Sequence, residues 1–241
     1  LHLGHSVRTV AECQQEAARD VTVLTSMLES RLVCGQRARY ESFARAIVAS
    51  FDAQAFFRAK LLEQQQRHIK YQDTPYSLEP NCKESPGGLR DLQVLLWVAR
   101  AGGLGTSWAE LQRRQLITRE EHAMLRRNER VLKDIRARLH IVAGRREDRL
   151  VFDVQTQVAA SAGFEAKGGR RASEVLMQRY YRAAKLVTQL NTIVLQNIEQ
   201  RLFPREEVAA TPIDASFVAR NELLDIADDC ALERDPNAIL R

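Results

Sequence analysis

The spacing of apolar residues predicts that most of the chain is helical. Between residues 172 and 202 apolar side chains recur in alternating steps of four and three, at Leu176, Tyr180, Ala183, Val187, Leu190 and Val194. This spacing keeps one seam of a long helix against a partner helix. The same period predicts helices over about 9–32, 37–49, 52–70 and 153–162, and helices that begin near Leu89, Ser107 and Thr118.

Capping signals mark several of these helix starts. Thr9 with Glu12, and Thr118 with Glu121, have the spacing of a capping box. In such a box the hydroxyl accepts a first-turn N–H, and the glutamate reaches back to the N–H of the cap residue. Core stripes are predicted on two of the helices, at Leu89, Leu92, Leu96 and Ala99 and at Leu125, Leu132, Ile135, Leu139 and Val142.

The two ends of the chain and one long loop interrupt the helical pattern. Residues 1–8 alternate briefly and stop at Gly4, which is typical of a strand end, and residues 71–88 form a loop with three prolines. The tail 213–241 is predicted to hold a short extended piece and a helix or two, with another helix opened by Asp235-Pro236. The predicted fold class is mainly α, a bundle of about seven or eight helices with a short N-terminal strand.

Composition narrows the class of protein. The 241 residues are 45% hydrophobic and 28% charged, with 11 glycines, 6 prolines and 6% aromatics, which favours helices over strands. No apolar run approaches the roughly 18 residues of a membrane span, and no signal peptide opens the chain, so no membrane partner is expected. The four cysteines match no disulfide or metal spacing, and we interpret them as reduced thiols of a cytoplasmic protein: Cys13, Cys34, Cys82 and Cys230.

The charge distribution bears on nucleic-acid binding. The net charge of +5 is mildly basic, and charges of both signs are mixed along the predicted helices. The densest basic group is Arg145-Arg146 with Arg149, followed by Arg170-Arg171. Such runs are typical of solvated helix ends and loops, whereas a nucleic-acid footprint gathers basic charge on one face. No nucleic-acid partner is therefore expected, and a basic RNA- or DNA-binding domain stays open as a weaker alternative.

Most familiar catalytic motifs are absent from the sequence. The histidines form no H-x-x-x-H or H-E-x-x-H pair, and none is followed by aspartate. There is no D-x-D pair, no P-loop and no G-x-S-x-G. His140 is interpreted as a core or boundary histidine, and Asp228-Asp229 as a helix-surface pair. The sequence thus offers no catalytic and no metal-ligating candidate.

One stretch, E-P-N-C-K-E-S-P-G-G-L-R-D at 79–91, departs from the helical pattern and could handle phosphate. Gly87 and Gly88 can adopt backbone angles that let successive N–H groups point one way just before a helix. A helix N-terminus carries unpaired N–H donors and partial positive charge, which attract anions. Lys83 and Arg90 would add full charges, and the Arg90 guanidinium is a flat two-pronged donor suited to phosphate.

The position of Arg90 on the predicted helix matters for this hypothesis. Arg90 falls near Gln93 and Trp97 and away from the apolar stripe, so we expect it to be free to face a cleft. The alternative is structural. Pro-Gly-Gly is a common turn, and Asp91 in the first helical turn can satisfy the helix dipole without any ligand.

Five segments carry a resemblance to a known family. They are E-P-N-C-K-E-S-P-G-G-L-R-D-L-Q at 79–93, G-H-S-V-R-T at 4–9, A-R-D-V-T-V-L-T-S-M-L-E-S-R-L at 18–32, E-Q-Q-Q-R-H at 63–68 and D-P-N-A-I-L-R at 235–241. In order, over essentially all 241 residues, the chain resembles the bifunctional uridylyltransferase/uridylyl-removing enzymes that modify the nitrogen-signalling protein PII. A related K-x-x-x-G-G-I-R-E element occurs in the glutamine synthetase adenylyltransferase family, which supports a role in nucleotidyl transfer.

The resemblance implies an architecture larger than this chain. It implies a polymerase-β-like nucleotidyltransferase domain, a helical domain, a His-Asp hydrolase domain and two domains that sense glutamine. Residues 1–8 are then expected to be the last strand of the transferase domain, 9–205 the helical domain and 206–241 a connector toward the hydrolase. The family's G-G-x-G-R-G-E-L and D-x-D elements are expected before Leu1, and its hydrolase motif after Arg241.

The resemblance also implies an activity. It implies Mg²⁺, UTP as donor and a PII tyrosine as acceptor of UMP, which the hydrolase domain later removes. Lys83, Gly87, Gly88 and Arg90 would border the triphosphate, with Ser6 and Arg8 from the strand end. Because two-metal transfer needs carboxylates that this chain lacks, we expect no activity from it alone. A non-catalytic helical module that docks PII or another protein is the main alternative, and the oligomeric state is left open.

Overall fold

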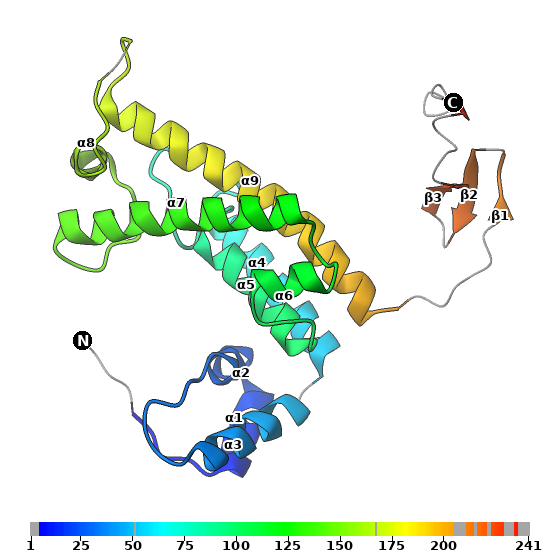
Figure 1. Ribbon diagram of the computed structural model, residues 1–241. Coiled ribbons are helices and arrows are strands. Elements are labelled where there is room, and N and C mark those ends of the chain that lie inside the picture. The colour runs from blue at the N-terminus through cyan, green and yellow to red at the C-terminus, as the bar shows by residue number, and fades with distance from the viewer. Residues whose placement is uncertain are drawn as a thin grey trace. The chain divides into compact units, whose positions relative to one another are not determined.

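The computed structural model describes residues 5–50, 52–166, 168–204, 211–214, 216–220, 223–228 and 234–235. It divides into two compact units, Leu1–Leu202 and Phe203–Arg241. Within the described ranges the first unit contains nine helices and the second contains three short strands (Figure 1). The prediction of a mainly α fold is confirmed. Residues 5–8 form no strand, and the rest of the predicted N-terminal strand lies outside the described residues.

Three helices near the N-terminus contact one another: α1 (Val10–Arg19), α2 (Val21–Leu28) and α3 (Arg37–Ala49). The capping box at Thr9 is confirmed, because Glu12 N donates to Thr9 Oγ1 at 3.3 Å and Thr9 N donates to Glu12 Oε2 at 2.6 Å. The prediction of one helix over 9–32 is wrong. Asp20 has extended backbone angles, and its Oδ1 accepts the Thr22 N–H at 2.6 Å, so it ends α1 and caps α2.

The larger part of the first unit is built around α5 (Leu89–Ala101). This helix contacts α2, α4 (Ala53–Lys70), α7 (Arg119–Ala143) and α9 (Ala172–Leu202). Being surrounded by four helices, α5 is buried on nearly every side, at Leu89, Leu92, Val94, Leu95, Trp97, Val98 and Ala99. The short α6 (Trp108–Arg113) and α8 (Phe152–Ser161) pack on α7, and α8 also packs on α9.

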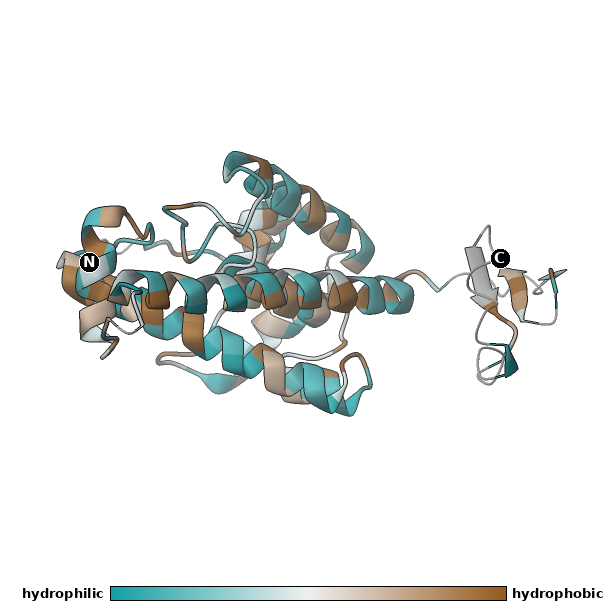
Figure 2. Ribbon diagram, turned by 90° about the horizontal axis from the view of Figure 1, so that it is seen from above, coloured by the Kyte–Doolittle hydropathy of each residue, from teal (hydrophilic) through white to brown (hydrophobic). Residues whose placement is uncertain are grey.

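The predicted seams of the long helices are confirmed. All six apolar positions of the α9 seam are buried: Leu176, Tyr180, Ala183, Val187, Leu190 and Val194. On α7 four of the five predicted positions are buried: Leu125, Leu132, Ile135 and Leu139. Figure 2 shows the same pattern as bands of hydrophobic residues that alternate with hydrophilic ones along the helices. The α7–α9 contact therefore rests on the period that the sequence displays.

Leu132 tests this seam. Its side chain is fully buried on α7, so we expect Leu132→Ala to lower the free energy of unfolding by about 3 kcal/mol through lost burial and a residual cavity. Ile141 lies on the same helix but is 78% exposed, and Ile141→Ala should change stability by less than about 0.5 kcal/mol. Urea denaturation followed by circular dichroism measures both. Equal effects of the two substitutions would mean that the seam is misplaced.

The second unit contains a small antiparallel sheet of order β1-β2-β3, formed by β1 (Thr211–Pro212), β2 (Phe217–Arg220) and β3 (Leu223–Ile226). Phe217 pairs with Ile226 in the β2–β3 register. The tail was predicted to hold one extended piece and a helix or two, so the sheet is larger than expected. The segments Phe217–Arg220 and Leu223–Ile226 are each only four residues long, which is too short for a helix, and they pair with each other instead. The helix expected after Asp235 lies outside the described residues.

Two further expectations concern the whole chain. Among the described residues no helix has both the length and the apolarity required to cross a membrane. Cys13, Cys34 and Cys82 are free thiols, while Cys230 lies outside the described part. Burial raises the pKa of the Cys82 thiol far above its usual value, so this side chain behaves as a small apolar residue.

Candidate functional site

The loop that precedes α5 has a fixed backbone. Asn81 Oδ1 accepts the N–H groups of Lys83 at 3.0 Å and Glu84 at 2.8 Å, and the Ser85 hydroxyl accepts the Asn81 N–H at 2.9 Å. Such asparagine-centred turns define the backbone without regular secondary structure. These bonds therefore define the backbone positions from which the Lys83 and Glu84 side chains extend.

A second strip of backbone holds this loop in place. Leu150 N donates to Pro80 O at 2.9 Å, and Cys82 N donates to Asp148 O at 2.7 Å. Asp148 is itself bound by Arg136 Nε at 2.6 Å and His140 Nε2 at 3.1 Å. Its burial raises the pKa of Asp148, but the hydrogen bonds from Arg136 and His140 and the charges of these two residues outweigh burial and lower the pKa overall. The segment after α7 thus holds the loop at Pro80 and Cys82 through backbone hydrogen bonds.

The two glycines are required by packing. Gly87 has φ +74°, and a Cβ there would lie 2.1 Å from the backbone oxygen of Ala184 on α9. A Cβ on Gly88 would lie 2.7 Å from Lys83 O. Both contacts involve backbone atoms, which cannot move aside easily. The turn therefore packs directly against α9, and only glycine fits at these positions.

The backbone N–H groups of the glycines have partners within the chain. Gly87 N donates to Asp91 Oδ2 at 2.7 Å, and Gly88 N donates to Ser85 O at 2.8 Å. Both glycines are buried. The sequence left open that Asp91 satisfies the start of the helix without any ligand. For the Gly87 N–H the structure shows this arrangement, because the Asp91 carboxylate accepts its hydrogen bond.

Asp91 is the centre of a buried polar network. The residue is fully buried. Its two carboxylate oxygens accept hydrogen bonds from Gln64 Nε2 at 2.9 Å, Arg67 Nη2 at 2.6 Å, His68 Nε2 at 2.9 Å and Gly87 N at 2.7 Å. Because a carboxylate only accepts, His68 carries a proton on Nε2. The network joins α4, the loop and α5 at one point.

The same network reaches α9. Asn191 Nδ2 donates to the backbone oxygen of Asp91 at 3.2 Å, and Asn191 Oδ1 accepts from Gln64 Nε2 at 3.0 Å. Burial raises the pKa of Asp91, but the hydrogen bond from His68, the charges of His68 and Arg67 and the bond from Gln64 outweigh it and hold the pKa below its usual value. This contribution to stability is therefore present above the unfolded pKa of about 3.9 and is lost as pH falls through the lowered folded value.

Arg90 is placed differently from the expectation. Its predicted neighbours are confirmed, because Nη1 donates to Gln93 Oε1 at 2.9 Å and the guanidinium lies 5.1 Å from the Trp97 ring centroid. The expectation that Arg90 is free to face a cleft is wrong, because its Nη2 also pairs with Glu84 Oε1 at 3.2 Å. The Arg90 side chain is 23% exposed, so it lies at the surface as part of an ion pair.

The carboxylate of Glu84 forms ion pairs with both Lys83 and Arg90. Lys83 Nζ lies 2.9 Å from Glu84 Oε1, and Arg90 Nη2 lies 3.2 Å from the same oxygen. Burial raises the pKa of Glu84, but the hydrogen bonds from Lys83 and Arg90 and their charges outweigh burial and lower it. Of the six candidate residues, the structure thus brings Lys83, Gly87, Gly88 and Arg90 together at the N-terminus of α5.

Ser6 and Arg8 lie elsewhere. Both are exposed, and they line a cavity of about 660 Å³ together with residues of α1, α2 and α3. None of the other four candidates lines this cavity. The structure therefore does not bring the N-terminal pair and the glycine loop into one pocket, and their joint role in nucleotide binding stays a prediction.

Sequence reasoning missed the α4 side chains of the network. Gln64, Arg67 and His68 are spaced i, i+3 and i+4, which places them on one face of a helix. The segment E-Q-Q-Q-R-H carried part of the resemblance, but the sequence did not indicate that these side chains bind Asp91. A polar face on an otherwise half-buried helix is the signal that could have indicated a buried acid opposite.

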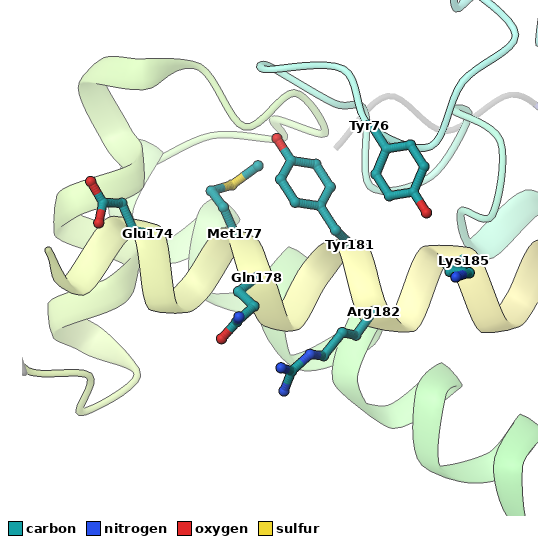
Figure 3. A pocket seen from close by; sticks show the side chains of 7 residues that line it. All are labelled: Tyr76, Glu174, Met177, Gln178, Tyr181, Arg182 and Lys185. Atoms are coloured by element: carbon teal, nitrogen blue, oxygen red, sulfur yellow. The ribbon is translucent and has the colours of Figure 1, made fainter. Parts of the chain in front are cut away.

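Two other cavities adjoin this region. One of about 230 Å³ lies between α5 and α7, lined by Leu89, Gln93, Glu129, Lys133, Arg136, Ala137 and His140. The other, about 380 Å³, lies along α9, where Figure 3 shows Tyr76 of the loop beside Tyr181. Tyr181 Oη donates to Ser77 O at 3.0 Å, and no candidate residue lines this groove.

The donor set does not fit Mg²⁺. Among the described residues there is no group of three or more His, Cys, Asp or Glu side chains that could hold a metal ion. The two carboxylates of the site, Asp91 and Glu84, are already bound by arginine, lysine and histidine side chains. A divalent cation there would meet positive charge, whereas Mg²⁺ needs oxygen ligands with open positions.

Comparison with known proteins agrees with the motif. The family model described as GlnD PII-uridylyltransferase matches residues 55–195. Over 240 residues the chain is 58% identical to the bifunctional uridylyltransferase/uridylyl-removing enzyme of Ralstonia nicotianae and 57% identical to that of Cupriavidus pinatubonensis. Each alignment covers 100% of this chain and 28% of the relative, so the chain spans about 28% of the length of these enzymes. No solved structure matches the chain. The chain belongs to the GlnD PII-uridylyltransferase family.

Proposed function

We propose that this chain is part of an enzyme that transfers UMP from UTP to a tyrosine of PII and removes it again by hydrolysis. The support is the family membership and the two-part name that the relatives carry. The proposed location is the cytoplasm. Mg²⁺ is proposed as the cofactor of the longer enzyme, held by carboxylates outside this chain.

The proposed role of this chain is to supply the helical wall of the nucleotide cleft. One observation carries it: Lys83 of the loop and Arg90 of α5 pair with a single partly exposed carboxylate, that of Glu84, at the N-terminus of α5. Cationic side chains fixed in this way neutralise phosphate charge without the cost of ordering them on binding. Gly87 and Gly88 set the close packing of the loop on α9, and Ser6 and Arg8 are proposed to approach the nucleotide from the preceding segment.

Arg90→Ala in the longer enzyme tests this role. Loss of a charged hydrogen bond to phosphate should raise the KM for UTP or slow uridylyl transfer by about 1–3 kcal/mol. Steady-state kinetics with PII as acceptor measure the effect. The matched control is Arg37→Ala, because Arg37 is 85% exposed and pairs with Glu41, one helical turn away on α3. Unchanged kinetics in a folded Arg90→Ala enzyme would instead favour the non-catalytic protein-binding module.

A further inference from the structure

Three cationic side chains from different segments surround the carboxylate of Glu84. Lys83 Nζ lies at 2.9 Å, Arg90 Nη2 at 3.2 Å and Arg67 Nε at 3.9 Å from its oxygens. Lys83 belongs to the loop, Arg90 to α5 and Arg67 to α4. A single carboxylate therefore links three elements at the edge of the site.

The local charge is not balanced. The only other carboxylate bound to these cations in the described structure is Asp91, which pairs with Arg67 at 2.6 Å. Three cations thus face two carboxylates, and protonated His68 would add a further positive charge. An excess of positive charge around partly buried groups attracts an anion.

The two carboxylates differ in how easily they can be displaced. Asp91 is 1% exposed at its side chain, and four donors from four residues saturate it. Glu84 is 22% exposed, and its backbone N–H is held independently by Asn81. The Glu84 side chain can therefore rotate outward while the loop keeps its conformation.

Glu84 also fails to satisfy the donors around it. Arg67 Nε is buried and has no hydrogen-bond partner within the described part of the chain. The Arg67 side chain is only 9% exposed, so little water can reach this donor. Its distance of 3.9 Å to Glu84 Oε2 is too long for a hydrogen bond. Arg90 Nε reaches the same oxygen only at 3.5 Å. A phosphate offers three oxygens where a carboxylate offers two, so it could serve all of these donors.

We propose that Glu84 is an exchangeable counter-ion, and that a phosphate group of a nucleotide replaces its carboxylate between Lys83, Arg90 and Arg67. The proposal rests on the proposed nucleotide cleft and deepens it. Without ligand, Glu84 keeps the three cations in their positions and limits their mutual repulsion. With ligand, the same positions bind phosphate, so the site is preorganised at the cost of some affinity.

Titration of inorganic pyrophosphate into the 241-residue chain at low salt, followed by calorimetry, tests the exchange directly. Glu84→Gln removes the competing charge but keeps the size of the side chain, so pyrophosphate should bind roughly tenfold more tightly, the size of one charge-assisted hydrogen bond. The control is Glu63→Gln, because Glu63 pairs with Lys60 at 2.7 Å on α4, outside the cluster, and its loss should leave pyrophosphate affinity unchanged.

Two results would overturn the proposal. One is a folded Glu84→Gln chain that binds pyrophosphate no better than the original, and the other is the absence of pyrophosphate binding by both proteins. A second readout needs no substitution. In the original chain, pyrophosphate should raise the NMR-detected pKa of the Glu84 carboxyl, and an unmoved Glu84 titration contradicts the exchange.

The failure of this inference can be told apart from failure of the proposed function. In the longer enzyme Glu84→Gln should lower the KM for UTP, whereas Arg90→Ala should raise it or slow transfer. If Arg90→Ala impairs transfer while Glu84→Gln changes nothing, the proposed nucleotide cleft is supported and the counter-ion role of Glu84 is contradicted. If Arg90→Ala has no effect, the proposed nucleotide cleft itself falls.

Discussion

Asp91→Asn is expected to lower the free energy of unfolding by about 3–5 kcal/mol, because it removes the carboxylate that bonds the buried Arg67 guanidinium at 2.6 Å and leaves only Glu84, at 3.9 Å. An asparagine cannot replace the carboxylate in either orientation. Its NH₂ group would face Arg67 and Gln64 on one side or Gly87 N and His68 on the other, and all of these are donors. Guanidinium denaturation followed by circular dichroism measures the loss.

The matched control for this substitution is Asp134→Asn. Asp134 also pairs with an arginine, Arg138, at 3.0 Å, but its side chain is 46% exposed. Surface pairs of this kind contribute about 0.5 kcal/mol or less. A similar small effect at both positions would show that Asp91 is not the centre of the fold around the loop. Stability that stays constant as pH falls from the unfolded pKa of about 3.9 through the lower folded pKa would contradict the lowered pKa of Asp91 as well.

Gly87→Ala is expected to destabilise the chain by roughly 2–5 kcal/mol. The left-handed backbone of Gly87 costs about 1–2 kcal/mol for a residue with a Cβ. The new methyl group would also lie 2.1 Å from the Ala184 carbonyl oxygen, and overpacking of this kind adds about 1–3 kcal/mol. Either the loop must lift from α9 or the helix must shift. Thermal and chemical denaturation of the purified chain measure the result.

Gly163 separates these two causes. It has the same φ of +74° as Gly87, but a Cβ there would meet nothing within 4 Å. Gly163→Ala should therefore show the backbone penalty alone, about 1–2 kcal/mol. If the two substitutions cost the same, the contact between the loop and Ala184 contributes nothing, and the glycine would be needed only for its backbone angles.

Local patterns were sufficient to predict most helices. The seams on α7 and α9 and the capping boxes depend on residues three or four apart, and such spacings are visible in the sequence. The break at Asp20 was missed because apolar residues continue across it at helical spacing, at Ala17, Val21, Leu24 and Leu28, whereas the break depends on one side-chain bond to Thr22. A single capping bond within a periodic segment does not change the spacing of the apolar residues, so the spacing does not reveal it.

The candidate site was only partly predictable for a different reason. Gln93 and Trp97 were expected beside Arg90 because they follow it at helical spacing, and this is confirmed. The pairs of Asp91 with Gln64, Arg67 and His68 join segments 23 to 27 residues apart. Nothing local specifies such pairs, since they exist only once α4 packs on α5. The role of Gly87 likewise depends on α9, which no turn signal could indicate.

Hydrogen exchange at the Gly87 amide is the most direct test of how the loop is built. In the structure the N–H groups of Gly87 and Gly88 bond within the chain, and Lys83 and Arg90 pair with Glu84, where we propose that phosphate binds. The Gly87 N–H, buried and bonded to Asp91 at 2.7 Å, should then exchange slowly in the chain alone, and UTP should leave its rate unchanged. Rapid exchange that UTP slows would contradict the account, because it would show that this amide is a binding group for phosphate.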